Sequence, residues 1–260
     1  MNILFIGDIF GKAGRKLIID RLPELKQELA IDLCLANGEN IAQGRGMTEK
    51  TANSLFAAGI DLFTSGNHLW DKKAALDFIK AEKRILKPIN LSSQAVGNEY
   101  FVHENEAGKK IAIFTVIGQA FMGPADSPFR ASDLILEKLP PDIAAIFVDF
   151  HAEATAEKRA LAHYLQGRVT ALVGTHTHIQ TADEEILPGG TAYITDVGMT
   201  GPHDSVIGVK KEIILEKILS SMPQRYEPAE GGLEINAVCI KLDDKTMRAT
   251  EIFRIKRKYD

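Results

Sequence analysis

The chain has 260 residues, of which 45% are hydrophobic and 25% charged, with a formal net charge of −4 at pH 7. This composition is that of a soluble globular protein, and the negative charge argues against a surface that coats nucleic acid, although not against a nucleotide-sized ligand. Cys34 and Cys239 lie in apolar runs, which favours buried free thiols over disulfides. The start, MNILFIGDIF, lacks the features of a signal peptide, and no apolar run reaches the roughly 20 residues of a membrane span. We therefore expect a cytoplasmic protein with no membrane partner.

The first third of the chain alternates short apolar runs with segments of helical spacing. The apolar runs predict strands at 2–8, 32–40 and 61–71. The intervening segments predict helices at 15–30, 48–59 and 72–83. This alternation is typical of βαβ units, in which helices cover a sheet of parallel strands.

The middle of the chain, residues 86–129, departs from this rhythm. Strand-like pieces at 99–103 and 110–117 flank the polar turn ENEAGKK, and a helix is expected at 130–138. We interpret the whole chain, 1–260, as one domain. Within it, residues 86–140 are the candidate for a small cap subdomain.

The segment between these pieces, residues 118–129, is polar and rich in Pro and Gly, yet contains Phe121 and Met122. There are two hypotheses for residues 118–129. The segment forms either a lid over a site or the interface of a homo-oligomer.

After residue 140 the α/β rhythm returns. The pattern predicts strands at 143–154, 169–178, 190–201, 232–242 and 247–256. It predicts helices at 156–166 and 210–221.

Five of the expected strands end in side chains that carry an oxygen or nitrogen of the kind that binds a transition metal. These residues are Asp8, Glu39, Asn40, Asn67, His68, His151, His176 and His178. In an open α/β sheet, ligands bind outside the carboxyl ends of the strands, so these side chains are expected to meet there. Carboxylate, amide and imidazole groups bind transition metals. The sequence therefore predicts a metal site at this edge.

Each of these residues also has an ordinary explanation when taken alone. Asp8 could cap the helix that follows it. Asn40 and Asn67 could be turn residues, because Asn tolerates left-handed backbone. Glu39 could be a solvated loop residue, and His151 a hydrogen-bonded core histidine.

The sequence VGTHTH brings His176 and His178 one residue apart. The period of two in a strand would place both imidazoles on one side, where they could bind one metal or two adjacent metals; the alternative is a strand end that faces water. Glu39 could bridge two ions roughly 3.5–4 Å apart, and a hydroxide between such ions is a nucleophile at neutral pH.

The segments GDIFG, NGEN, SGNHLWD, DFHAEAT and VGTHTHIQTAD, in this order, resemble the motifs D-x-H, G-D, G-N-H, H and G-H-x-H of the calcineurin-like metallophosphoesterases. The sequence is most similar to the YmdB-like phosphodiesterases, from end to end and including AYITDVGMTGP. The resemblance implies an α/β fold in which two β-sheets are flanked by helices (αββα), with the metal site at the carboxyl ends of the strands.

Two positions depart from the superfamily motifs. Phe10 replaces the histidine of D-x-H and cannot bind metal, and Glu39 replaces the bridging aspartate. Asn40 could supply the contact that Phe10 cannot. The resemblance then implies one metal held by Asp8, Asn40 and His178, a second held by Asn67, His151 and His176, and Glu39 between them.

The resemblance also implies the activity, which is hydrolysis of cyclic nucleotides, above all 2′,3′-cyclic nucleotides, with other phosphodiesters as further substrates. In this expectation a bridging hydroxide attacks the phosphate and His68 protonates the leaving oxygen; alternatively His68 only stabilises phosphate charge. The cofactors would be two transition-metal ions, iron first, with manganese or zinc as alternatives.

Two other functions remain open. One is a phosphomonoesterase or 5′-nucleotidase that uses the same site. The other is a regulatory protein that binds a nucleotide with negligible turnover. Neither a membrane nor a nucleic-acid duplex is expected as a partner, and the sequence does not identify the substrate-binding residues.

Overall fold

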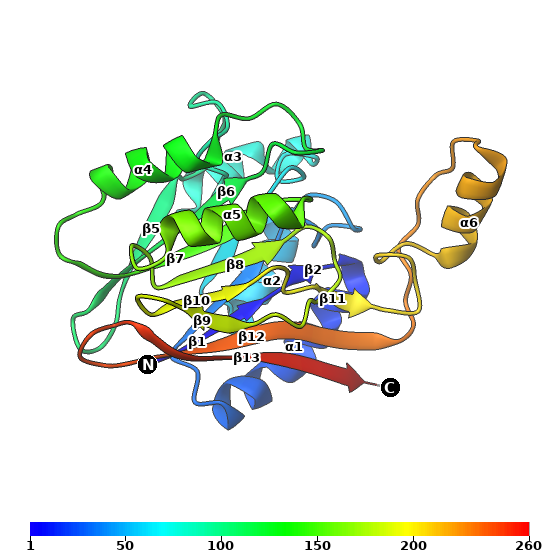
Figure 1. Ribbon diagram of the computed structural model, residues 1–260. Coiled ribbons are helices and arrows are strands. Elements are labelled where there is room, and N and C mark those ends of the chain that lie inside the picture. Colours follow the sequence, from blue (N-terminus) through cyan, green and yellow to red (C-terminus); the bar gives the residue numbers. More distant parts are fainter. Residues whose placement is uncertain (260) are drawn as a thin grey trace.

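The computed structural model describes residues 1–259. Two β-sheets pack against each other, with helices on their outer faces (Figure 1). This confirms the αββα arrangement expected from the sequence.

The first sheet has the order β2-β11-β12-β1-β3-β4, with β13 paired to β12. Its strands are β1 (Asn2–Ile6), β2 (Asp8–Ile9), β3 (Leu33–Asn37), β4 (Leu62–Thr64), β11 (Met199–Pro202), β12 (Leu233–Leu242) and β13 (Ala249–Tyr259). The strands β1, β3 and β4 are parallel, as the βαβ pattern predicts, whereas β12 runs antiparallel to β1. The parallel strands therefore end at one edge.

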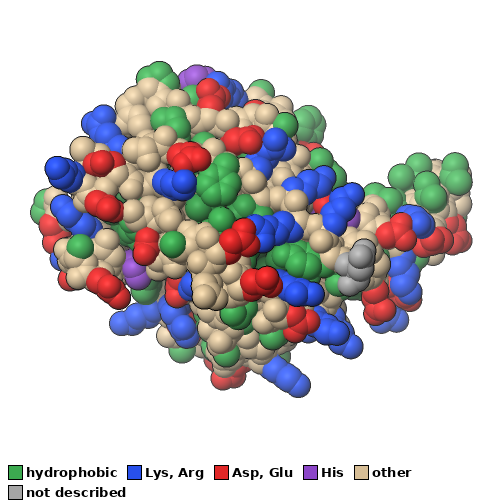
Figure 2. Space-filling model, turned by 90° about the horizontal axis from the view of Figure 1, so that it is seen from below, with side chains coloured by type: hydrophobic (Ala, Val, Ile, Leu, Met, Phe, Trp, Pro, Cys, Tyr) green, Lys and Arg blue, Asp and Glu red, His purple; other side chains and the backbone are tan. Residues whose placement is uncertain are grey.

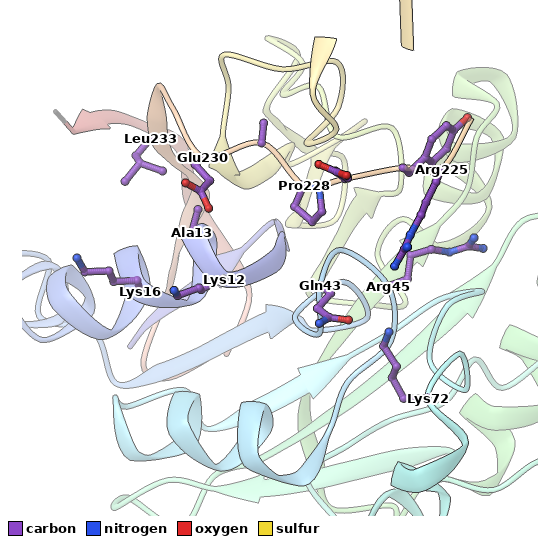
Figure 3. Close-up of a pocket in the computed structure, with 13 residues that line it drawn as sticks. Lys12, Ala13, Lys16, Gln43, Arg45, Lys72, Arg225, Pro228, Glu230 and Leu233 are labelled. Carbon is purple, nitrogen blue, oxygen red and sulfur yellow. The ribbon is translucent and has the colours of Figure 1, made fainter. Parts of the chain in front are cut away.

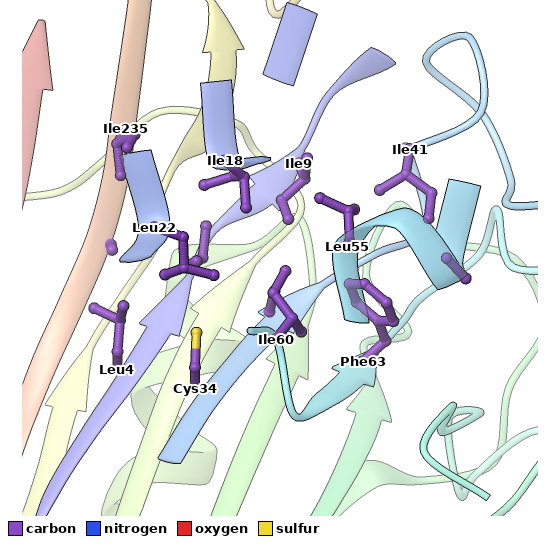
Figure 4. Packing of buried hydrophobic residues seen from close by; sticks show 14 of the residues in the cluster. Leu4, Ile9, Ile18, Leu22, Cys34, Ile41, Leu55, Ile60, Phe63 and Ile235 are labelled. Atoms are coloured by element: carbon purple, nitrogen blue, oxygen red, sulfur yellow. The ribbon is translucent and has the colours of Figure 1, made fainter. Parts of the chain in front are cut away.

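Helices α1 (Gly11–Glu28) and α2 (Glu49–Ala57) cover the outer face of the first sheet. Leu22 of α1 and Leu55 of α2 pack with Leu4, Cys34 and Phe63 of the strands (Figure 4). Burial of a side chain of this kind stabilises the fold by roughly 1.5–3 kcal/mol. The 3₁₀ helix η1 (Lys73–Ala75) and α3 (Leu76–Ala81) follow β4.

The second sheet has the order β5-β6-β7-β8-β10-β9. Its strands are β5 (Tyr100–Glu104), β6 (Lys110–Ile117), β7 (Ile143–His151), β8 (Ala171–Thr175), β9 (Glu185–Leu187) and β10 (Thr191–Ile194). Helices α4 (Pro128–Lys138) and α5 (Thr155–Leu165) lie on its outer face (Figure 1). Between the sheets, Phe5 stacks on Phe147 with ring centroids 5.4 Å apart.

The boundaries of several elements differ from those that the sequence predicts. Helix α1 starts four residues earlier than expected, and β9 was not predicted. The prediction of a strand over 169–178 is wrong at its end, because β8 stops at Thr175. His176 and His178 then have φ angles of 102° and 65°. The alternation of side chains along a strand therefore does not determine where their imidazoles point.

The segment 86–140 supplies β5 and β6 to the second sheet and α4 to its outer face. The division of the chain into domains stays a prediction. Phe121 is 91% exposed, and its segment stays a candidate for either a lid or an interface.

Helix α6 (Lys211–Ser220) lies on an arm that projects from the body of the protein (Figure 1). Figure 2 shows the face of the protein that lies at the bottom of Figure 1, where basic and acidic side chains are interspersed. Cys34 and Cys239 are buried free thiols, which confirms that expectation. Between residues 1 and 259 no helix has the length and apolar character to cross a membrane.

Candidate metal centre

The eight residues predicted at strand ends come together at one edge of the sandwich. Asp8 begins the short strand β2 just after β1, and His151 is the last residue of β7. The others follow β3, β4 and β8, and the carboxyl ends of these strands meet at that edge. A cavity of about 540 Å³ opens onto them and is lined by Glu39, Asn40, His68, His176 and His178. The structure thus assembles residues that are up to 170 positions apart in the sequence (178 − 8).

Asp8, Asn40 and His178 form one group of ligand-type side chains. Asn40 Nδ2 lies 3.4 Å from Asp8 Oδ1 and 3.2 Å from His178 Nε2. His178 Nε2 and Asp8 Oδ1 are 3.8 Å apart. Asp8 does not cap α1, because Phe10 is the N-cap residue and no side chain caps that helix.

Glu39, Asn67, His151 and His176 form the second group, with His151 Nε2 at its centre. This nitrogen lies 3.1 Å from Glu39 Oε1, 3.0 Å from Asn67 Oδ1 and 3.0 Å from His176 Nδ1. Ligand atoms of Glu39, His151 and His176 all lie within 4.8 Å of one another, as a shared metal ion requires. Asn67 therefore aims its side chain at the cluster rather than at a turn.

The three histidines are oriented as metal ligands usually are. A metal-binding imidazole commonly donates its second N–H to an oxygen, which fixes the tautomer and leaves the other nitrogen free. Each histidine here has such an oxygen on the ring nitrogen that faces away from the cluster. The contacts are His151 Nδ1 to Thr175 Oγ1 (2.8 Å), His178 Nδ1 to Ile207 O (3.0 Å) and His176 Nε2 to Glu153 Oε2 (3.2 Å).

The electrostatics of the cluster also fit a cation. Asp8 is fully buried, and burial raises its pKa above the usual value. Burial opposes the charged form of Glu39 as well, but its interactions with His151 and His68 together outweigh this effect and lower the pKa of Glu39 to about 2. Two buried carboxylates are costly without compensating charge, which metal ions would supply. The carboxylate, amide and imidazole donors are a set that transition metals accept.

His68 lies beside the second group without being part of it. Its backbone N–H donates to Glu39 Oε2 at 2.9 Å, and its Nε2 is 3.2 Å from Asn67 Nδ2. Its Nδ1 lies 3.0 Å from Asp71 Oδ2, and Arg45 Nε is 3.0 Å from the same oxygen. With the proton on Nδ1, this nitrogen donates a hydrogen bond to the carboxylate of Asp71, and Nε2 is then the nitrogen that can exchange a proton near the cluster.

Sequence reasoning missed the residues that hold the two His-bearing loops in place. Asp71 follows His68 by three residues in SGNHLWD, and that spacing was the available signal. Lys158 of α5 and Asp196 gave no such signal. Buried Lys158 Nζ donates to Thr175 O at 2.8 Å and to Asp196 Oδ2 at 2.7 Å, and Asp196 Oδ2 accepts the N–H of Thr177 at 3.1 Å.

The remaining histidines lie elsewhere. His203 does not line the cavity, and its Nε2 contacts Met199 O at 2.9 Å. His103 is on β5 and His163 is on α5. Phe10 lines the cavity beside His178, with ring centroids 5.7 Å apart.

Comparison with known proteins gives a consistent result. The profile of the family described as YmdB-like protein matches residues 4–255. The chain is 44% identical to the 2′,3′-cyclic-nucleotide 2′-phosphodiesterase of Bacillus subtilis strain 168 over 256 residues, which cover 98% of this chain and 96% of that protein.

Two solved structures are also similar. A Thermus thermophilus protein described as hypothetical has a TM-score of 0.94 and 38% identity, with both chains covered completely. A phosphatase from Mycoplasma pneumoniae has a TM-score of 0.94 and 34% identity, covering 99% of this chain and 93% of its own.

Proposed function

The chain belongs to the YmdB-like family, and on this premise we propose that it is a metal-dependent phosphodiesterase that hydrolyses 2′,3′-cyclic nucleotides. The observation that carries the proposal is the presence of two groups of ligand-type side chains at one edge of the sandwich, with His68 outside both groups at the cavity wall. The Bacillus relative, similar over almost its full length, supports a phosphodiesterase or phosphatase activity and a cyclic nucleotide as the substrate.

Two transition-metal ions would activate water and neutralise phosphate charge. Asp8, Asn40 and His178 would hold one ion, with Asn40 presenting its oxygen after rotation of the amide. Asn67, His151 and His176 would hold the other, and Glu39 would contact both. Iron is our first candidate, with manganese or zinc as alternatives.

His68 is the candidate general acid. It faces the cavity next to the second group, and Asp71 holds its Nδ1 side. In this proposal Nε2 gives a proton to the 2′ oxygen as the bond between that oxygen and phosphorus breaks. Imidazole suits this task because its unperturbed pKa, near 6.5, lies close to neutrality. A 3′-phosphate would remain on the nucleotide.

The cavity wall favours a nucleotide over a small phosphate. Five residues with apolar surface line the cavity, although metal binding does not require them: Phe10, Ile207, Val209, Tyr226 and Pro228. A volume of about 540 Å³ lies within the range of small-molecule sites, roughly 300–1,000 Å³. A ribose and base would use this surface.

A panel of substrates tests the activity. We expect the protein to hydrolyse 2′,3′-cyclic AMP. We also expect it to hydrolyse the diester bis-p-nitrophenyl phosphate faster than the monoester p-nitrophenyl phosphate. A clear preference for the monoester would instead establish the phosphatase alternative, which the Mycoplasma relative represents.

Replacement of one histidine tests the mechanism and the binding-only alternative. His68→Ala should lower kcat by about 10²–10⁴-fold with the metal content retained. His163→Ala, at an exposed histidine on α5, is the matched control and should retain full activity. Wild-type activity in His68→Ala would remove His68 from the mechanism, and negligible turnover by the wild-type protein would favour a nucleotide-binding role.

A further inference from the structure

A second cavity has a volume of about 840 Å³ (Figure 3). It lies between α1, the loop that carries Gln43 and Arg45, and the segment 225–230 that descends from the α6 arm. Four residues line both cavities: Gln43, Arg45, Tyr226 and Pro228. The two spaces are therefore adjacent and share a wall, so a ligand longer than one nucleotide can extend from the first into the second.

The second cavity is cationic in a protein that is acidic as a whole. Its lining contains five basic side chains and two carboxylates, although the net charge of the chain is −4. The basic residues are Lys12, Lys16, Arg45, Lys72 and Arg225. The carboxylates are Glu227 and Glu230. Figure 3 shows Lys12 and Lys16 along one side of α1, with Lys72 and Arg225 pointing towards the loop of Arg45.

Most of this positive charge has no ion-pair partner within the protein. Arg45 is paired with Asp71 at 3.0 Å, but across residues 1–259 no ion pair includes Lys12, Lys16, Lys72 or Arg225. Glu227 is itself paired with Lys210, which lies outside the lining, at 2.7 Å. Lys12 and Lys16 are one helical turn apart, so two like charges stand next to each other on α1, an arrangement that is unfavourable without an anion.

We propose that this cavity binds the backbone phosphates of a single-stranded oligoribonucleotide whose 3′ end carries the 2′,3′-cyclic phosphate. The inference rests on the proposed function and names its substrate class. The terminal nucleotide occupies the metal-site cavity, and its 5′ oxygen leads the preceding phosphates towards Arg45 and the lysines. Tyr226, which lines both cavities, offers a ring on which a base stacks.

The reaction at the end of the chain is the same as for a mononucleotide. Water adds to phosphorus, the bond from phosphorus to the 2′ oxygen breaks, and that oxygen receives a proton. The products are a 2′-hydroxyl and a 3′-phosphomonoester on an otherwise intact oligonucleotide. The unpaired lysines add affinity through release of counterions from the phosphates.

The test compares a tetraribonucleotide ending in 2′,3′-cyclic phosphate with 2′,3′-cyclic AMP. In the wild-type protein, kcat/KM should be about tenfold or more higher for the tetranucleotide and should fall more steeply with salt. In the double variant Lys12→Gln/Lys16→Gln, the ratio of the two kcat/KM values should fall by about fivefold or more. For the tetranucleotide, the slope of log KM against the logarithm of the salt concentration should be about 1.4 lower in the double variant. Each of the two lost phosphate contacts accounts for about 0.7 of that slope.

Lys245→Gln is the matched control, because Lys245 is an exposed lysine in the turn between β12 and β13. It should keep the wild-type ratio. Equal kcat/KM for both substrates, or a ratio unaffected by the double variant, would overturn the proposal.

A binding measurement separates this inference from the proposed activity. A fluorescent tetraribonucleotide with a 3′-phosphate, the expected product, should bind more tightly than adenosine 3′-phosphate, and the double variant should abolish the difference. This holds whether or not the cyclic nucleotide is turned over. Equally tight binding of inorganic tetraphosphate would overturn the assignment to RNA.

Discussion

Lys158 lies beneath the loop that carries His176 and His178, and its replacement by methionine should destabilise the protein. Its side chain is completely buried, and its two hydrogen bonds go to Thr175 O and Asp196 Oδ2. Methionine keeps most of the aliphatic volume but leaves the carboxylate of Asp196 without its counterion. Breaking a buried pair in this way usually costs about 3–5 kcal/mol.

The expected loss for Lys158→Met lies at the lower end of that range, about 3 kcal/mol. The reason is that Asp196 keeps two backbone donors, the N–H of Thr177 at 3.1 Å and of Gly198 at 2.8 Å. These donors continue to stabilise its charge. The double variant Lys158→Met/Asp196→Asn should be more stable than the sum of the single losses predicts, by about 1–3 kcal/mol.

Urea unfolding of the chelator-treated proteins measures this free energy without a contribution from bound metal, and an unchanged m-value validates the comparison. Lys245→Met, at an exposed lysine, is the control and should change stability by less than about 0.5 kcal/mol. A loss below about 1 kcal/mol for Lys158→Met, or strict additivity in the double variant, would refute the reasoning. Metal content of the variant should also fall, because the loop that positions both histidines loses its support.

Three further outcomes are expected. Elemental analysis should find close to two transition-metal ions per chain, and Glu39→Ala should lose both, because Glu39 is proposed to contact both; retention of two ions would contradict its role. Gly66→Ala should lower the metal content and reduce the free energy of unfolding in urea by about 1–3 kcal/mol, because a Cβ at this position would lie 2.0 Å from Cδ2 of His151. Gly123→Ala is the control and should match the wild type, because a Cβ there has no atom within 4 Å. Cys34, whose pKa burial raises, should react with dithionitrobenzoate only after unfolding, and rapid labelling of the native protein would argue against that burial.

The meeting of the candidate ligands was predictable from sequence for a simple physical reason. Parallel strands buried between layers read as apolar runs, and their carboxyl ends lie at one edge. A polar residue shortly after such a run, like Asp8 or Asn67, is therefore placed by the fold itself. The helices were predictable because their apolar residues recur with helical spacing, as in α1 and α2.

The supporting residues could not be predicted in this way. Lys158 lies in a helical pattern where a lysine usually faces water, and its partner Asp196 is 38 positions away. The orientation of His176 and His178 could not be predicted from the sequence, because strand β8 ends before them and the backbone takes positive φ values that are uncommon for residues other than glycine. Packing around that loop, not a local preference, imposes them.

The alternation of strands and helices, the family resemblance and the chemical identity of the candidate metal ligands all follow from the order of residues along the chain. The tertiary fold determines which atoms face one another, such as Glu39 and Asn67 around His151 and Asp71 beside His68. It also brings Lys12, Lys72 and Arg225, from three separate segments, around one cavity. The physical reason is that hydrophobic periodicity is local in the chain, whereas charge and ligand geometry depend on distances between side chains that only the packed fold sets.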